Sequence, residues 1–352
     1  MARLKQLSAI NRVPAQMRIA TYNVNGINGR LSVLLRWLKT HQPDVACLQE
    51  LRAPQEKFPL KEIEALDYHA LWHGQKSWNG VAILGRGERP IELRRGLPGD
   101  PEDLHSRYLE AELFGITIGC LYLPNGNPAP GPKFDYKLAW FRRLNAHAAA
   151  LLRTGRPTVL CGDYNAVPTP LDAYKPERWV GDAVFFPETR ELYRQLVAQG
   201  WTDALRHLHP GEAIYTYWDY FRNAFGRNAG LRMDHLLLSP VLAKQLAAAG
   251  VDREVRSWEK TSDHAPAWIE LKGSLTKAPK GKRRVSSSKE KSSRATNAPA
   301  GHSHRTSQVR KRTQLKTKME GKSAGPSAAR GQASSSPKRK TKVQGLQREK
   351  TR

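Results

Sequence analysis

The sequence predicts a protein of the α/β class, and three observations support this prediction. Apolar runs of strand length alternate with longer segments of helical periodicity between residues 17 and 272. All Phe, Trp and Tyr residues lie within the first 272 residues, which gives this region enough apolar material for one large domain. Polar side chains recur where the apolar runs end, and ligand sites of α/β proteins collect at strand ends.

The first predicted unit is a strand, a helix and a second strand. Residues 17–23 (MRIATYN) form an apolar run that ends in a glycine-containing turn. Leucines at positions 31, 34, 35 and 38 have the spacing of an amphipathic helix, which we expect to stop before the HQPD segment because Pro43 disfavours helix in the residue before it. Residues 45–50 (VACLQE) form the second strand. Asn23 and Glu50 are therefore expected at the same edge of the sheet.

The same pattern recurs along the chain. The run ITIGCLYLPNG is a strand that ends near Tyr122, and a helix is expected from about residue 133 to residue 152. RPTVLCGDYNAVP is a strand that terminates in Asp163 and Asn165. GLRMDHLLLSP carries Asp234 inside an otherwise apolar strand, where an unpaired carboxylate is costly to bury. The turn KTSDHAP places an acid and an imidazole side by side just after these strands.

Each polar residue also has a structural interpretation. The alternatives are turn formation for Asn23, Asp163, Asn165, Asp263 and His264, a helix cap or an ion pair with Arg52 for Glu50, and a core position for Tyr122. Six polar sites at strand ends, contributed by the whole length of the chain, favour one shared functional site.

Residues 273–352 have a different composition. They hold 23 of the 58 Lys and Arg residues, 3 of the 32 Asp and Glu residues, and no aromatic residue. Such a segment cannot bury enough apolar surface to offset its ordering entropy, so we expect a disordered basic tail. Clusters such as KGKRR at 280–284 would bind DNA phosphates without sequence preference. In a eukaryotic host they would instead suit a nuclear address.

Other features indicate the compartment. Residues 1–16 are basic and lack the apolar core of a secretory signal, so we expect a disordered extension, with a transit peptide as the alternative. Cys47, Cys120 and Cys161 lie inside apolar runs without CxxC spacing, which is typical of buried free thiols in a reducing compartment. No apolar run reaches the roughly 18 residues of a membrane span, so no membrane partner is expected.

The motifs, taken in order, resemble those of the exonuclease III family of apurinic/apyrimidinic (AP) endonucleases. They are TYNVNG, DVACLQE, GQKSWNGVAIL, LYLPNGN, LCGDYNAVP, WTDALR, YTYWDY, GLRMDHLLLS and SDHAP. The wider superfamily, with pancreatic-type deoxyribonucleases, inositol-phosphate phosphatases and sphingomyelinases, shares the Glu, Asp-x-Asn and Ser-Asp-His elements. The segment YTYWDYFRNAFGRNAGLRMDH resembles the lesion-recognition loop of the DNA-repair branch.

The resemblance implies a four-layer α/β sandwich, in which two mixed β-sheets pack face to face between helices. The implied organisation is an extension at 1–16, a catalytic domain at 17–272 and the tail at 273–352. The implied cofactor is Mg²⁺, with Mn²⁺ as a substitute, because a hard cation favours carboxylate oxygens. The implied substrate is double-stranded DNA with AP sites or blocked 3′ ends, bound by a monomer.

The resemblance also implies roles for individual residues. Glu50 would be the main metal ligand, with Asn23 close by and Asp263 assisting. Asp163 and Asn165 would hold and activate the attacking water. A two-metal scheme would add Asp163, Asn165 and His264 to the ligands, and the sequence does not choose between the schemes.

The remaining roles concern phosphate and DNA. Tyr122 would position the phosphate, and Asp234 would pair with His264 so that the imidazole stabilises charge on the phosphate. The expected DNA contacts are Asn23, Asn25, Arg107, Trp218, Arg222 and Arg232. Trp218 and the residues after it would frame the pocket for the baseless sugar.

The favoured interpretation is therefore a Mg²⁺-dependent repair phosphodiesterase in base excision repair. It would incise 5′ to AP sites and act on 3′ ends as an exonuclease and end-cleaning enzyme. One alternative is a phosphatase of small or lipid phosphates, against which the basic tail and YTYWDYF argue. The other is a non-catalytic DNA-binding protein, against which the intact polar set argues. We expect a bacterial cytoplasmic location with the nucleoid, or the nucleus in a eukaryote.

Overall fold

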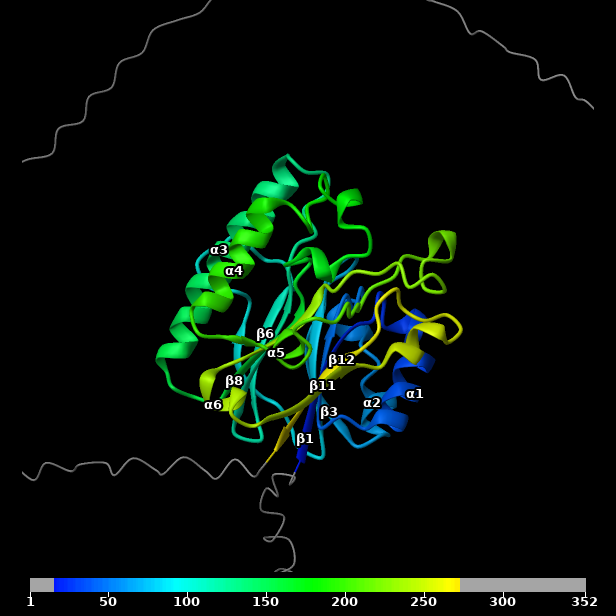
Figure 1. Cartoon of the computed structure of the whole chain (residues 1–352). Helices are drawn as coiled ribbons and strands as arrows, with labels where there is room; N and C mark the ends of the chain where they lie inside the picture. Colours follow the sequence, from blue (N-terminus) through cyan, green and yellow to red (C-terminus); the bar gives the residue numbers. More distant parts are fainter. Residues whose placement is uncertain (1–15, 273–352) are drawn as a thin grey trace, which may run out of the picture. The chain divides into compact units, whose positions relative to one another are not determined.

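The computed structural model describes residues 16–272, which form two six-stranded β-sheets stacked between layers of helices (Figure 1). This architecture confirms the predicted four-layer α/β sandwich. The predicted tail and all but the last residue of the predicted N-terminal extension lie outside the described residues.

The first sheet contains β1 (Gln16–Asn23), β2 (Val45–Gln49), β3 (Tyr68–His73), β4 (Val81–Arg86), β11 (Leu246–Val251) and β12 (Ala267–Lys272). The second contains β5 (Ile91–Arg95), β6 (Tyr108–Leu113), β7 (Ile116–Tyr122), β8 (Thr158–Asp163), β9 (Thr202–Asp203) and β10 (Asp234–Leu238). The α-helices are α1 (Leu31–His41), α2 (Leu60–Glu64), α3 (Pro132–Arg153), α4 (Pro187–Ala198), α5 (Ala204–Leu208) and α6 (Pro240–Ala243). Short 3-10 helices are η1 (Asn28–Arg30), η2 (Gln55–Lys57), η3 (Pro170–Asp172), η4 (Pro176–Arg178), η5 (Phe221–Asn223) and η6 (Arg253–Ser257).

Each sheet has one parallel pair of strands among antiparallel neighbours. The strand orders are β11-β12-β1-β2-β4-β3 and β5-β6-β7-β8-β10-β9. The parallel pairs are β1 with β2 and β7 with β8. Parallel strands end at the same sheet edge, so the registers place Asn23 beside Gln49 and Tyr122 beside Asp163.

Apolar side chains from both sheets fill the space between them. Ile19 and Val45 of the first sheet and Ile118 and Val159 of the second belong to one fully buried core. The outer faces are covered by α1 and α2 on the first sheet and by α3 and α4 on the second (Figure 1). This packing holds the two sheet edges that carry the polar residues in one rigid frame.

The cysteines behave as the sequence predicts. Cys47, Cys120 and Cys161 are buried and free. Separately, within residues 16–272 no helix has the length and apolar character needed to cross a membrane.

Three boundaries differ from the predictions. The helix α1 continues through His41 and ends because Gln42 adopts a left-handed conformation, with φ 45°, while its amide still bonds to Leu38. Glu50 lies just beyond β2 with φ 51°, not within the strand. Asp234 is the first residue of β10, so its carboxylate lies at the sheet edge and not inside the strand.

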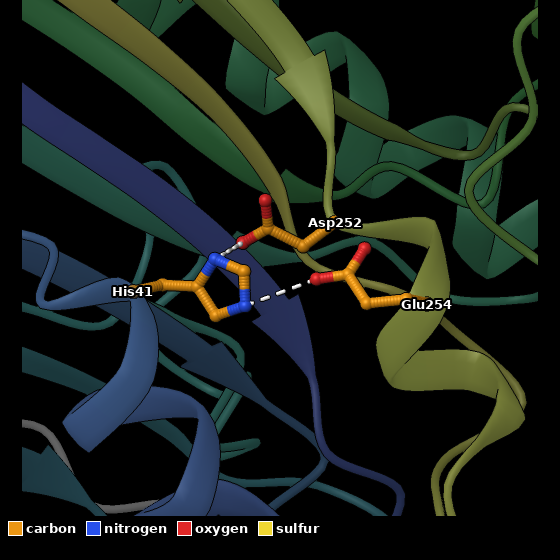
Figure 2. A group of neighbouring side chains, drawn as sticks. All are labelled: His41, Asp252 and Glu254. Carbon is orange, nitrogen blue, oxygen red and sulfur yellow. Dashed lines mark ion pairs between the residues drawn. The ribbon is translucent and has the colours of Figure 1, made fainter.

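An ion-pair cluster ties the end of α1 to η6 (Figure 2). His41 Nδ1 lies 3.3 Å from Asp252 Oδ2, and its Nε2 lies 3.0 Å from Glu254 Oε1. Asp252 also accepts hydrogen bonds from Arg18 and from Trp37 Nε1, each at 2.8 Å. The two carboxylates contact different ring nitrogens, and one ligand atom from each of the three residues lies within 4.8 Å of the other two. The cluster is a structural clamp between β1, α1 and η6.

Asp252→Asn is expected to lower the free energy of unfolding by about 2–4 kcal/mol, because it removes the charge that pairs with Arg18 and His41 in a buried setting. Glu254→Gln, whose side chain is 55% exposed in the native protein, should change stability by no more than about 0.5 kcal/mol. Denaturant unfolding followed by tryptophan fluorescence measures both. Equal, small losses would contradict the central role of Asp252.

Candidate active site

The polar strand ends open onto one cavity of about 870 Å³. Its wall includes Glu50 after β2, Tyr122 at the end of β7 and Asp163 at the end of β8. His264, from the turn before β12, completes this part of the wall. The structure therefore brings together residues separated by more than 200 positions in the chain.

Asn23 joins the two sheets at this cavity. Its Nδ2 lies 2.9 Å from Glu50 Oε1 and 2.9 Å from Asp163 Oδ2. Its Oδ1 accepts a hydrogen bond from the amide of Asn25 at 3.0 Å, and the residue is fully buried. One amide thus fixes two carboxylates side by side, one from each sheet.

Both oxygens of Glu50 have partners. Oε1 also accepts from the Tyr122 hydroxyl at 2.7 Å, and Oε2 accepts from Arg52 Nε at 2.9 Å. The ion pair with Arg52 is thus present, as the structural interpretation of Glu50 allowed. Burial and the charges of Glu50 and Asp163 raise the pKa of Tyr122, so its hydroxyl keeps the proton that it donates.

Asp163 and Asn165 form the expected turn. Asp163 Oδ1 accepts from the amide of Asn165 at 2.8 Å, and Asn165 Nδ2 donates to Leu123 O at 2.9 Å. Burial raises the pKa of the Asp163 carboxyl to about 7, with the His264 cation opposing the shift and Asp234 adding to it.

Asp234 and His264 form the expected pair. His264 Nδ1 lies 2.7 Å from Asp234 Oδ2, and Nε2 lies 3.8 Å from Asp163 Oδ2. Burial disfavours the charged ring, but Asp234, Asp163 and Asp263 outweigh it and raise the pKa of His264 to about 10. The imidazole is therefore a cation at neutral pH, and the Tyr217 ring packs edge-on against it with centroids 5.1 Å apart.

Other expected residues also reach the cavity. Asp263 accepts from Asn25 Nδ2 at 2.9 Å. Arg107 lies over the Tyr122 ring at 4.8 Å and donates to Tyr122 O at 3.3 Å. Both Asp263 and Arg107 line the cavity wall.

The donor set fits a hard divalent cation. Oxygens dominate, and ligand atoms of Asp163, Asp234 and His264 all lie within 4.8 Å of one another. Two buried oxygens, Asp234 Oδ1 and Asn25 Oδ1, accept no hydrogen bond from residues 16–272. Both residues contact residues of the cavity wall, Asp234 through His264 and Asn25 through Asp263, and unpartnered buried oxygens at such places are suited to a bound cation or its water ligands.

The expected role of Arg232 is wrong. Arg232 is 1% exposed, and its Nε donates to Asp172 Oδ1 at 2.6 Å. Its Nη1 donates to Asp203 Oδ2 at 2.8 Å and lies 2.9 Å from His235 Nδ1. Because buried carboxylates from η3 and β9 occupy its donors, this arginine does not reach DNA.

The expected role of Trp218 as a pocket wall is also wrong. Trp218 is 1% exposed, packs edge-on against Phe225 and donates to Asn228 Oδ1 at 3.2 Å. Its neighbour Tyr217 faces the cavity instead, because successive side chains of an extended segment point to opposite sides. Arg222 is exposed on η5 outside the cavity wall, and its DNA contact stays a prediction.

Two residues beneath the site were not predicted. Asn125 Nδ2 donates to Asn165 Oδ1 at 3.0 Å. The fully buried Lys137 donates to the carbonyls of Asn125 at 2.9 Å and Asn165 at 2.5 Å, and burial lowers its pKa to about 7. The available signal for Lys137 was its position on the apolar face of α3, beside Phe134, Leu138 and Phe141.

The fold and this constellation define a class: enzymes that hydrolyse phosphate esters at the edge of a two-sheet sandwich. Residues 20–264 match the model of the Endonuclease/Exonuclease/phosphatase family. Exodeoxyribonuclease III of Haemophilus influenzae is 36% identical over 268 residues, covering 73% of this chain and 100% of the relative. DNA repair nuclease APEX1 of Danio rerio is 32% identical over 263 residues, covering 73% of this chain and 83% of the relative.

Solved structures give the same result. A 3′-5′ exonuclease from Neisseria meningitidis is 39% identical, with a TM-score of 0.71 over 73% of this chain and 100% of that chain. An AP endonuclease from Archaeoglobus fulgidus is 35% identical, with a TM-score of 0.69 over 72% of this chain and 98% of that chain. The chain therefore belongs to the endonuclease/exonuclease/phosphatase family, in its exonuclease III branch. It is a nuclease of a metal-dependent family, which confirms the resemblance seen in the sequence.

Arg232→Leu is expected to lower the free energy of unfolding by about 3–5 kcal/mol, because Asp172 and Asp203 then remain buried without their cation. Arg222→Leu is the matched control and should change stability by no more than about 0.5 kcal/mol, since Arg222 is exposed. Urea unfolding compares the two variants. A stable Arg232→Leu protein with weakened DNA binding would instead restore the original interpretation.

Proposed function

We propose that this nuclease incises duplex DNA 5′ to AP sites and removes nucleotides or blocking groups from 3′ ends, using Mg²⁺, which Mn²⁺ can replace. The observation that carries the proposal is the Asn23 bridge, which holds Glu50 and Asp163 together at 2.9 Å each beside the His264 cation. Relatives support the substrate class: one solved neighbour is a 3′ phosphatase from Neisseria bound to a product DNA hairpin.

Asp163 is the proposed base. Its pKa of about 7 allows the carboxylate to accept a proton from the attacking water at neutral pH. The amide of Asn165, 2.8 Å away, fixes the carboxylate, and the Asn165 side chain would help to orient the water or contact the phosphate. Lys137 holds this turn from below through the carbonyl of Asn165.

His264 is the proposed electrostatic partner of the phosphate. Asp234 holds Nδ1, so Nε2 is the nitrogen that faces Asp163 and the cavity. A charged N–H donor fixed in this position stabilises the charge that develops on a nonbridging oxygen. Tyr122 and Arg107 place further donors in the same wall and would position the phosphate.

Glu50 is the proposed main ligand of Mg²⁺, with Asn23 and Asp263 beside it. The ion would supply Lewis-acid stabilisation of the phosphate oxygens. In a two-metal arrangement Asp163, Asn165 and His264 would hold a second ion, and His264 would then bind it as the neutral imidazole, after losing the proton that it otherwise carries at neutral pH.

We propose that the protein acts as a monomer in a bacterial cytoplasm, associated with the nucleoid. The three free thiols are those of a reducing compartment, and the relative from Haemophilus influenzae is bacterial.

Glu50→Gln tests the proposal on a duplex oligonucleotide with one AP-site analogue. The wild-type protein should cut it with Mg²⁺ and not with a chelator, and the variant should be slower by about 100-fold or more at limiting Mg²⁺. The amide keeps an acceptor for Tyr122 and Asn23, so thermal unfolding should be nearly unchanged. Near wild-type cleavage would refute Glu50 as ligand. Efficient hydrolysis of inositol phosphates with no cutting of DNA would refute the substrate class.

Residues 273–352 lie outside the described residues, and we propose that they tether the enzyme to DNA through their basic clusters. The clusters would neutralise DNA phosphates and release counterions. Because the segment has no aromatic residue on which bases could stack, this binding would not depend on the DNA sequence. Truncation after Lys272 should leave single-turnover cleavage at saturating enzyme unchanged. Binding to undamaged DNA should weaken at low salt, with a shallower dependence of log affinity on log salt. An unchanged salt slope would refute the tether.

A further inference from the structure

A second Asp–His pair lies at the cavity wall, in the loop between β5 and β6. His105 Nδ1 lies 2.8 Å from Asp103 Oδ1, and His105 lines the same cavity as Glu50 and Asp163. The mechanism proposed above uses neither residue of this pair. As in the pair of Asp234 and His264, an aspartate oxygen contacts Nδ1 of the ring, but His105 lies on a different part of the wall.

The carboxylate of Asp103 is held in place by side chains of α3. Its side chain is 6% exposed, and it forms an ion pair with Arg143 from α3. The Tyr136 hydroxyl, also from α3, lies 3.0 Å from Asp103 Oδ1. Burial opposes ionisation, but the hydrogen bonds from Arg143, His105 and Tyr136 outweigh it and lower the pKa of this carboxyl. Asp103 therefore stays charged and fixes the loop to the helix.

This anchor orients the His105 ring. Nδ1 is occupied by Asp103 and lies 3.1 Å from the Tyr136 hydroxyl, and the two rings are 5.6 Å apart. Nε2 has no hydrogen-bond partner within residues 16–272, and the side chain is 48% exposed. His264 is 4% exposed by comparison. One nitrogen of His105 is thus held by protein, and the other is open to a ligand from solution.

The charged side chains around His105 indicate which class of ligand its free nitrogen would bind. Lys133, one turn before Tyr136 on α3, lines the same cavity and is exposed, and Arg107 lies two residues beyond His105. The acid beside the ring, Asp103, is already paired with Arg143. An oxyanion is the ligand that donors from Lys133 and His105 would bind together.

We propose that His105, oriented by Asp103 and Tyr136 and assisted by Lys133, binds an unreacted backbone phosphate of DNA next to the one that is cut. This proposal rests on the proposed function, because it takes DNA as the substrate. With Nδ1 held by Asp103, the exposed Nε2 is the ring nitrogen that would donate its N–H to a nonbridging phosphate oxygen. The contact is the same before and during the reaction, so it adds affinity without accelerating the chemical step.

The first test is kinetic. His105→Ala should lower kcat/KM on the AP-site duplex by about five- to tenfold, with kcat at saturating DNA nearly unchanged. His105→Gln, which keeps a donor, should recover part of the loss. His207→Ala is the matched control, because His207 is an exposed histidine outside the cavity wall, and it should behave as wild type. A loss confined to kcat would overturn the proposal.

The second test identifies the ligand. Duplexes carry a neutral methylphosphonate at one position at a time on either side of the cleavage site, and kcat/KM is measured for each. The wild-type protein should lose about five- to tenfold at the phosphate that His105 contacts, whereas His105→Ala should lose nothing further there. Equal sensitivity of both proteins at every position would overturn the phosphate contact.

A failure of the proposed function and a failure of the phosphate subsite give different results. If the wild-type protein does not cut the unmodified AP-site duplex, the proposed function fails. If it cuts normally and His105→Ala keeps its full phosphate sensitivity, only the subsite fails. Denaturant unfolding of His105→Ala and of Asp103→Asn shows whether the loop variants stay folded, and Asp103→Asn should weaken binding through the freed ring.

Discussion

The site depends on one side-chain amide that spans the two sheets. Asn23 ends β1 in the first sheet, yet its Nδ2 reaches Asp163 of the second sheet at 2.9 Å while it also holds Glu50. Ser262 donates to the carbonyl of Asn23 at 2.7 Å, which attaches the His264 turn to the same point. The geometry of the whole site therefore depends on how the sheets pack, because a shift of one sheet would separate the two carboxylates.

Crowded carboxylates set the electrostatics of the cavity. Glu50 and Asp234 lie near the buried Asp163, and their charges add to the burial that raises the pKa of the Asp163 carboxyl. The charged His264 offsets part of this repulsion, and Arg52 pairs with Glu50 at the rim. A divalent cation would complete the balance, which explains why carboxylates and amides, and not thiols, occupy these strand ends.

The sequence predicts the parts of the structure that depend on local pattern. Strand periodicity predicts β1, β2, β7 and β8. Polar residues at the ends of the last three line one cavity, and Asn23 at the end of β1 binds two of them. The DNA contact predicted for Arg232 is wrong because its partners, Asp172 and Asp203, are distant in sequence. The pocket role predicted for Trp218 is wrong because its side chain packs inward on Phe225 and Asn228, which lie in the same segment of the chain. A pattern of residue types does not specify which side of an extended segment faces a cavity. Lys137 and His105 show the same limit, since each acts through a contact made only in the folded chain.

The central place of β1 in its sheet determines at which stage of folding the nuclease site is complete. This strand lies between β2, which follows it closely, and β12, which comes at the far end of the described chain, so that Ile19 pairs with Val45 on one side and Ile269 on the other. The pairing of β1 with β12 forms late in folding, because closing the long intervening chain costs conformational entropy before the contacts between the strands are made. The turn that carries His264 directly precedes β12 and docks with it. A chain emerging from the ribosome would therefore carry Glu50 and Asp163 long before it could cut DNA, and nuclease activity would begin only when the last strand is in place.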